Sequence, residues 1–481
     1  MYIALDRNIR YARPAFGGKA VDQPLAKRHI VMISLPDMAT FFMRGPSNES
    51  IIQGIYAAFF GLDLTAIGLI LMLSRIFDAL IHPVVGVMSD RAMLKHGTRK
   101  PWLVAGIVVS LIGMWGLYNP GSGVGAGYFL TFYLLAYMGW TLAEVPYGAW
   151  KAEVSHSYTT RTHIAATDTV TTVVGTIAFS LVPIVMHAMG LVSATEHSPA
   201  TLRVTSQIAL ITLPILVLIA LAYVPDGKPL VRPSQSDWNQ TWQAIIRCKP
   251  LLLYAVILSI VGLVVGFMNA VSYLYAARYL HIPELIVYLG SFSWIVSMLA
   301  IPAAAWVCNH IGKHIAMAVA ITIGVVLAGV SDFLVNHTDP NHAVLQYQVA
   351  FIILATLGSA STGFIYVSLK AMIGDLADYG QWKFGGNFTG AYITVVMLGY
   401  RLTTGVASFL ALWLLKEFGF DAMGNAEITA SGAWGMRLAN NWIPFVIGLS
   451  CLPMLFKYPL DKRRHSIIVR ALERRARRQA A

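Results

Sequence analysis

The stretch RIFDALIHPVVGVMSDRAMLKHGTRKPW, residues 75–102, decides how the rest of the chain is interpreted. Its first part is apolar but carries Asp78 and His82 four residues apart, which places both side chains on one face of a helix. Ionisable groups inside a membrane-compatible helix are costly and usually face a water-filled cavity or a partner. The second part leaves the apolar phase at Ser89 and ends in a basic turn, as cytoplasmic loops do. The stretch therefore predicts a membrane helix followed by a cytoplasmic connection.

The composition of the chain is that of an integral membrane protein. Of its 481 residues 57% are hydrophobic and 12% are charged, whereas soluble domains carry about 25% charged residues. The 40 Gly and 21 Pro lie largely within apolar runs, which is common in transmembrane helices. The three Cys follow no disulfide or metal spacing. Because no signal-peptide pattern precedes the first apolar stretch, we expect the first membrane helix to direct insertion.

Twelve stretches are long and apolar enough to cross a membrane as helices, which need about 20 apolar residues. The first is interrupted at Gly45–Asn48, which predicts a kink or a partly unwound segment. No stretch shows the alternating pattern of a membrane barrel. The expected membrane helices are residues 29–62, 64–88, 102–118, 127–148, 166–189, 203–224, 251–279, 285–307, 315–336, 346–370, 387–415 and 441–458.

The distribution of basic residues predicts the orientation. Most of the 35 Lys and Arg lie in the two tails and in the connections on the same side of the membrane. Basic connections stay in the cytoplasm, so both termini are expected there and the number of spans is even. This asymmetry accounts for the net charge of +12 without a nucleic-acid partner. The opposite side holds at most Arg203, Arg278, Lys416 and Arg437.

A polar, proline-rich connection at 225–250 divides the predicted helices into six and six. The segment SDRAMLKHGTRKP after the second helix has a weaker counterpart, CNHIGKHIA, after the eighth. Two six-helix halves related by a parallel repeat describe an all-α integral membrane protein with the major facilitator fold, which binds substrate between its halves. The predicted parts are a cytoplasmic N-tail at 1–28, six-helix bundles at 29–224 and 251–458, and a basic cytoplasmic C-tail at 459–481. The C-tail either lies as a helix on the inner leaflet or is simply a retained basic tail.

Asp78 and His82 are candidates for binding a proton or a cation. Imidazole titrates near neutral pH and relays protons beside a carboxylate. Asp78 has an alternative, purely structural role, because Arg75 precedes it by three residues on the same helix. Both interpretations stay open at this point.

The fourth predicted helix carries a polar stripe in the sequence WTLAEVPYGAW, residues 140–150. Thr141 and Glu144 share one face, and Tyr147 continues it one turn later, with Trp140 beside it. A carboxylate with neighbouring aromatic rings binds sugar-like ligands by hydrogen bonding and stacking. A lone membrane Glu also serves simply as a hydrogen-bond partner of a neighbouring helix, and the sequence favours neither role.

Two arginines indicate an anionic ligand. Arg401 lies well inside the eleventh helix, and Arg44 lies beside the break in the first. Because a guanidinium has no accessible neutral form, each needs an anion or water in the bundle unless it reaches an interface. Alternatively, Glu144 and Asp78 already neutralise the two arginines, and no anionic ligand is then required. Asp168, early in the fifth helix, is a further charged candidate.

Polar residues at the cytoplasmic mouths of both halves predict a gate. The segment AMIGDLADYGQWKFGG, residues 371–386, is expected to be a loop that carries an acidic pair. Either this loop is merely solvated, or it latches onto the connection after the second helix. The residues of the predicted latch are Asp90, Arg91, Arg99, Lys100, Asp375 and Asp378.

The stretches DALIHPVVGVMSDR, GTRKPW and DLADYG resemble the signatures of the glycoside–pentoside–hexuronide:cation symporters of the major facilitator superfamily, the group that includes melibiose permease. The resemblance runs through most of the chain and is strongest at 73–103, 140–162 and 371–402. It implies that Asp78 and Thr141 bind the coupling cation. It also implies substrate contacts at Glu144 and Arg401, with Asp37 in the region of a further sugar-binding Asp.

The departures from this family change what the resemblance implies about the ion. His82 stands where the family has a second Asp, and Ile81 where it has an Asn. Because Na⁺ is a hard cation that needs several oxygen ligands, H⁺ is the expected coupling ion and Na⁺ is less favoured. Gly148 and Thr169 replace a sugar-stacking Trp and a sugar-binding Arg, so a simple galactoside is not implied.

The sequence thus predicts a secondary transporter that moves a sugar-like or anionic solute by alternating access and proton symport. An alternative is a carrier of lysolipid-like or other amphipathic acids, and a second is a membrane sensor or assembly factor that transports nothing. No nucleotide, catalytic or zinc-binding motif is present, so neither an enzyme nor a cofactor is expected. The expected setting is a monomer in the inner membrane, with membrane lipids and a small-molecule substrate as its partners.

Overall fold

The computed structural model describes residues 25–48, 50–121, 123–155, 158–227, 238–335, 345–385, 388–423 and 427–480, and in this part of the chain the protein is entirely helical. The N-terminal half contains α1 (Lys27–Asn48), α2 (Ile51–Phe60), α3 (Leu64–His96), α4 (Lys100–Tyr118), α5 (Ala126–Glu153), α6 (Tyr158–Ala188) and α7 (Pro199–Tyr223). A short helix, α8 (Trp238–Arg247), lies in the central connection. The C-terminal half contains α9 (Lys249–Leu274), α10 (Pro283–His310), α11 (Lys313–Val335), α12 (Leu345–Phe384), α13 (Thr389–Glu417), α14 (Ala430–Arg437), α15 (Ile443–Phe456) and α16 (Lys462–Ala480).

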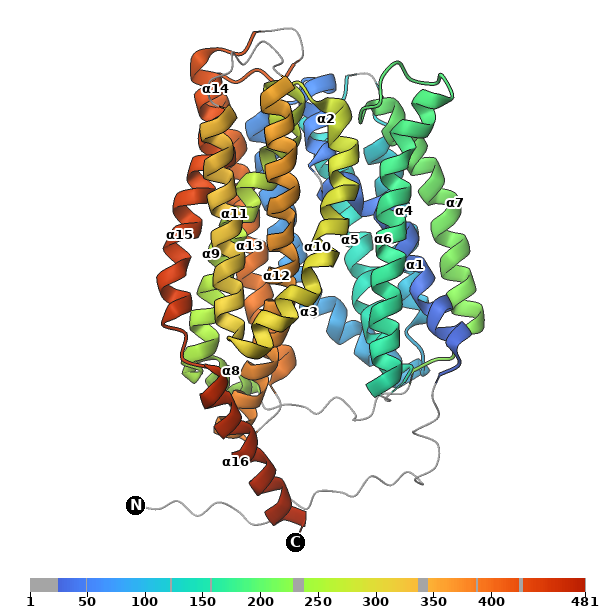
Figure 1. The fold of residues 1–481 in the computed structure, drawn as a ribbon. Coiled ribbons are helices and arrows are strands. Elements are labelled where there is room, and N and C mark those ends of the chain that lie inside the picture. Colours follow the sequence, from blue (N-terminus) through green and yellow to red (C-terminus); the bar gives the residue numbers. More distant parts are fainter. Residues whose placement is uncertain are drawn as a thin grey trace.

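Within the described residues, ten helices are long and apolar enough to cross a membrane. The two remaining predicted spans, 29–62 and 127–148, coincide with α1–α2 and with α5. Figure 1 shows the long helices side by side, with α1 beginning, α15 ending and α16 lying at one end of the bundle. We call this the termini end and the opposite one, where α2 and α14 lie, the far end. The all-α fold is confirmed, whereas the exact number of crossings stays a prediction.

The predicted break in the first span is real but lies slightly later. Helix α1 continues through Gly45 and Pro46 to Asn48, and Ser50 then adopts a left-handed backbone with φ 63° before α2. A proline within a helix loses one backbone hydrogen bond without ending the helix, so the chain turns at Ser50 instead.

The prediction of a loop at 371–386 is wrong for most of these residues, because α12 continues as a helix to Phe384. Met372 and Leu376 lie four residues apart on α12, and both side chains are buried against the neighbouring helices. The apolar face of α12 therefore extends beyond the predicted span. Helix α3 likewise continues to His96 and ends at Gly97, whose φ of 73° favours glycine.

The two halves pack against each other at the far end. The ring of Tyr273 in α9 lies against Gly54 of α2, where an added Cβ would come within 2.0 Å of it. The Tyr273 hydroxyl donates a hydrogen bond to the carbonyl of His197, 2.9 Å away. Asp63, which caps α3, forms an ion pair with Lys416 near the end of α13. These contacts close the far end between the halves.

Candidate functional site

Glycine contacts fix the two helices that contribute most to the site, α5 and α13. In α4, a Cβ on Gly106 would lie 2.4 Å from the backbone nitrogen of Ala143 in α5. In α9, a Cβ on Gly262 would lie 2.6 Å from the carbonyl oxygen of Tyr400 in α13. Such close backbone approach is typical of membrane helix pairs. It holds the neighbours of these contacts, Glu144 and Arg401, at defined positions.

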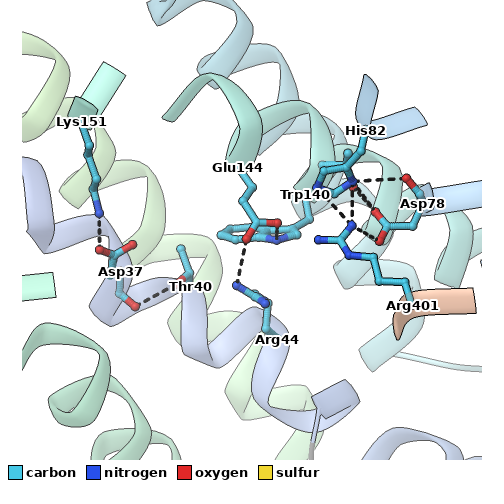
Figure 2. Close-up of polar contacts among 10 residues, drawn as sticks. Asp37, Thr40, Arg44, Asp78, His82, Trp140, Glu144, Lys151 and Arg401 are labelled. Atoms are coloured by element: carbon cyan, nitrogen blue, oxygen red, sulfur yellow. Dashed lines mark hydrogen bonds and ion pairs between the residues drawn. The ribbon is translucent and has the colours of Figure 1, made fainter. Parts of the chain in front are cut away.

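Asp78 lies at the centre of a polar cluster built from three helices (Figure 2). Its Oδ1 accepts a hydrogen bond of 2.7 Å from Thr141 of α5, and its Oδ2 lies 2.6 Å from Nη1 of Arg401 in α13. The Asp78 side chain is 7% exposed, so this carboxylate depends on these partners for its solvation. The alternative pairing of Asp78 with Arg75 is not observed, because the Arg75 guanidinium lies 5.2 Å from the centre of the Tyr137 ring.

The ring of His82 lies between the anion and the cation of this cluster. Its Nδ1 is 3.0 Å from Oδ1 of Asp78 and 2.8 Å from Nη1 of Arg401. A neutral Nδ1 accepts a hydrogen bond from Arg401, whereas a protonated Nδ1 donates to Asp78; one atom does not do both. The presence or absence of a proton on Nδ1 of His82 thus decides whether this nitrogen binds Asp78 or Arg401.

A second group of residues lies on α1 and α5. Arg44 is 3.7 Å from Glu144, and its guanidinium lies 4.7 Å from the centre of the Trp140 ring. Trp140 donates a hydrogen bond of 2.8 Å from Nε1 to Glu144 (Figure 2). The side chains of Arg44 and Glu144 are 41% and 37% exposed, so both are accessible to a ligand.

A third group lies nearer the termini end, where Lys151 of α5 reaches two carboxylates. Its Nζ forms an ion pair with Asp37 of α1 and lies 2.9 Å from Oδ1 of Asp168 in α6. The Tyr147 ring packs 4.1 Å from the same ammonium, and the Tyr147 hydroxyl donates to the carbonyl of Ile33. Tyr147 is 6% exposed, so its expected contact with substrate stays a prediction.

Sequence reasoning placed most of these side chains but missed Lys151. The sequence assigned it to a connection, whereas α5 continues to Glu153. The signal was available, because Lys151 follows Glu144 by seven residues and Tyr147 by four, and so lies on the same face. Arg44, Asp78, Glu144 and Arg401 were expected from sequence, but not which of them pair.

The residues of the predicted latch form two separate clusters in this conformation. In the N-terminal half, Arg99 binds Asp90 at 2.7 Å and Glu153 at 2.8 Å. Lys100 donates to the carbonyls of Leu221 and Val224 at the end of α7, and Arg91 is exposed.

In the C-terminal half, Asp375 forms an ion pair of 2.5 Å with Lys313, and His465 of α16 lies 2.9 Å from Asp378. Within the described residues, no ion pair between the two clusters is observed. A latch between the halves therefore stays a prediction for a conformation closed at the termini end.

The sequence profile of the MFS/sugar transport protein family matches residues 36–462. The chain belongs to this family. It is similar to the isoprimeverose transporter of Lactiplantibacillus pentosus, with 23% identity over 85% of this chain and 83% of that protein. It is also similar to the glucuronide carrier protein homolog of Escherichia coli K12, with 24% identity over 93% of this chain and 96% of that protein.

A solved structure shows the same fold. The nucleoside transporter NupG superposes with a TM-score of 0.63 at 12% identity, over 89% of this chain and 99% of that chain. The protein is therefore a secondary transporter of the major facilitator superfamily in a multi-pass, inner-membrane setting, and its family is one of carriers and not of enzymes. The predicted fold class and transporter class are confirmed.

Proposed function

We propose that this transporter couples the uptake of a sugar-like anion to a proton, with both termini in the cytoplasm. The observation that carries the proposal is the position of His82 between Asp78 and Arg401. Asp78 and His82 belong to the N-terminal half and Arg401 to the C-terminal half. A proton on His82 therefore changes a contact that joins the two halves, as alternating access requires.

The coupling follows from the charges. With His82 neutral, Arg401 has both the ring nitrogen and the Asp78 carboxylate as acceptors. Once protonated, His82 competes with Arg401 for the Asp78 carboxylate, and its positive charge repels the Arg401 guanidinium. The proton thus weakens the ion pair between α3 and α13, which lets the halves move relative to each other. With the far end closed, this conformation would face the cytoplasm.

Na⁺ is less favoured as the coupling ion at this site. Arg401 already occupies Oδ2 of Asp78, and His82 offers a nitrogen where a hard cation would need an oxygen. Thr141 contributes one further oxygen, but its hydroxyl donates to Asp78.

Arg44, Glu144 and Trp140 are the residues we propose for the substrate. The Arg44–Glu144 distance of 3.7 Å is long for a charge-assisted hydrogen bond, so a substrate carboxylate competes for the guanidinium at small cost. Glu144 accepts hydrogen bonds from sugar hydroxyls, and the Trp140 ring offers a stacking face. The two relatives, an isoprimeverose transporter and a glucuronide carrier homolog, support a glycoside or uronide as the substrate.

Uptake into proteoliposomes with an imposed pH gradient tests the coupling. We expect the pH gradient, and not a Na⁺ gradient, to drive accumulation, and His82→Ala and Asp78→Asn to abolish it. His96→Ala, an exposed histidine at the end of the same helix, is the matched control and should transport normally. Intact gradient-driven accumulation in both site variants would refute the coupling site.

A thermal-shift screen of uronides, neutral glycosides and lysolipids tests the substrate class. Uronides should stabilise the wild-type protein, and Arg44→Gln should remove this effect while leaving any effect of neutral glycosides. Stabilisation by lysolipids alone would instead support the amphipathic alternative.

A further inference from the structure

The ion-pair group of Asp37, Lys151 and Asp168 has no role in the coupling described above. Each residue comes from a different helix, α1, α5 and α6, and all three side chains are largely buried, with exposures of 18%, 13% and 28%. One ammonium contacts both carboxylates, so that oxygens of Asp37 and Asp168 lie next to the same Nζ. Two carboxylates so close together share one proton more readily than they carry two charges.

Among the side chains that the structure describes, none near the group neutralises the second carboxylate. Tyr147 supplies a ring and turns its hydroxyl toward the carbonyl of Ile33. Helix α7, which also packs against α1, carries Arg203 as its only charged residue, in its first turns at the far end. On α6, His163 is exposed. Among the described side chains the group therefore has a net charge of −1, which a low-dielectric location disfavours unless a cation binds.

The group lies in line with the coupling site. Thr141, Glu144 and Lys151 follow one face of α5, at steps of three and seven residues. At a rise of about 1.5 Å per residue, Lys151 lies roughly 10 Å from Glu144 toward the termini end. On α1, Arg44 and Asp37 are separated by the same seven residues. Along α5, these carboxylates therefore lie between the coupling site and the termini end.

We propose that Asp37, Lys151 and Asp168 form a second proton-binding site, which receives the coupling proton before its release at the termini end. The two carboxylates of Asp37 and Asp168 share one proton, while Lys151 remains an ammonium and contacts both of them. The neutral state has one protonated carboxyl, one carboxylate and one ammonium; deprotonation restores the net charge of −1. This inference rests on the proposed proton coupling.

Two transport assays on the full-length protein in proteoliposomes test the site. Asp37→Asn and Asp168→Asn should lower pH-gradient-driven accumulation to the level reached without a gradient. Substrate counterflow, which requires no net proton release, should stay near the wild-type rate in Asp168→Asn, whose residue is not among the expected substrate contacts. Asp168→Glu, which keeps the carboxyl group, should retain driven accumulation. Asp421→Asn, at an exposed position at the far end, is the matched control.

Infrared difference spectroscopy between acidic and neutral pH supplies a readout that does not depend on transport. The wild-type protein and Asp78→Asn should both show a protonated-carboxyl band that is absent from Asp37→Asn and Asp168→Asn. Driven accumulation at the wild-type level in these two variants, or equal loss of counterflow and accumulation in Asp168→Asn, would overturn the second site alone. A wild-type protein that no pH gradient drives would overturn the proposed coupling and this site together.

Discussion

Nη1 of Arg401 lies 2.6 Å from Oδ2 of Asp78, although the two residues are 323 positions apart and belong to different halves of the bundle. This ion pair is one of the polar contacts between α3 and α13. The two helices also approach closely at Gly68, where an added Cβ would lie 3.0 Å from Cα of Phe409. The pair therefore contributes both to stability and to the contact that must rearrange during transport.

A double-mutant cycle measures the contribution of the pair to stability. Arg401→Gln removes a partner of the buried Asp78 carboxylate, which costs about 3 kcal/mol when a charge is left unpaired. We expect the melting temperature of the purified protein to fall in Arg401→Gln and in Asp78→Asn, and to recover partly in the double variant, where neither charge remains. Additive losses in the double variant would show that the two side chains act independently.

Closure of the far end depends on the absence of a side chain at Gly54. In Gly54→Ala the new Cβ would meet the Tyr273 ring at 2.0 Å, so the ring and the helix that carries it have to move. We expect labelling of cysteines introduced at the far end to increase. Gly148→Ala, with no atom within 4 Å of its new Cβ, is the control. Unchanged labelling in Gly54→Ala would contradict this account.

The ion pair of Asp63 with Lys416 should not contribute to pH dependence near neutrality. Burial raises the pKa of Asp63, but its bonds to Lys416 and to the amide of Ala66 outweigh this effect, so the pKa lies below its usual 3.8. A carboxylate with a lowered pKa stabilises the folded state above its usual pKa and loses that contribution as pH falls below it. We expect Asp63→Asn to leave the shape of the uptake–pH curve between about pH 5 and 8 unchanged. A shifted midpoint in Asp63→Asn would refute this.

Asp332 should be a stability residue of the C-terminal half. Its side chain is 1% exposed and accepts hydrogen bonds from Arg437, Asn441 and Trp442 at 2.9–3.1 Å. Asp332→Ala leaves Arg437 without its buried carboxylate, which costs about 3–5 kcal/mol. We expect a lower melting temperature and lower yield, with an unchanged apparent substrate affinity in the protein that folds. Loss of affinity at unchanged stability would show a role in binding instead.

The sequence by itself determined the fold class, because hydrophobic length, helix periodicity and basic asymmetry are local properties that the bilayer imposes on each segment. It also indicated Asp78, Glu144 and Arg401, since a charge inside an apolar helix is visible without any partner. It missed the helical ends of α3, α5 and α12, where packing extends a helix beyond its apolar span, and with them Lys151.

Only the tertiary structure decided which charges meet. The sequence offered Arg75 as a partner for Asp78, because residues three apart share a helix face. The close approach of α3 and α13 at Gly68 and Gly405 instead lets Arg401 reach Asp78 from the other half. Pairing between residues hundreds of positions apart depends on the distance between packed helices. The periodicity of a single helix does not determine that interhelical distance.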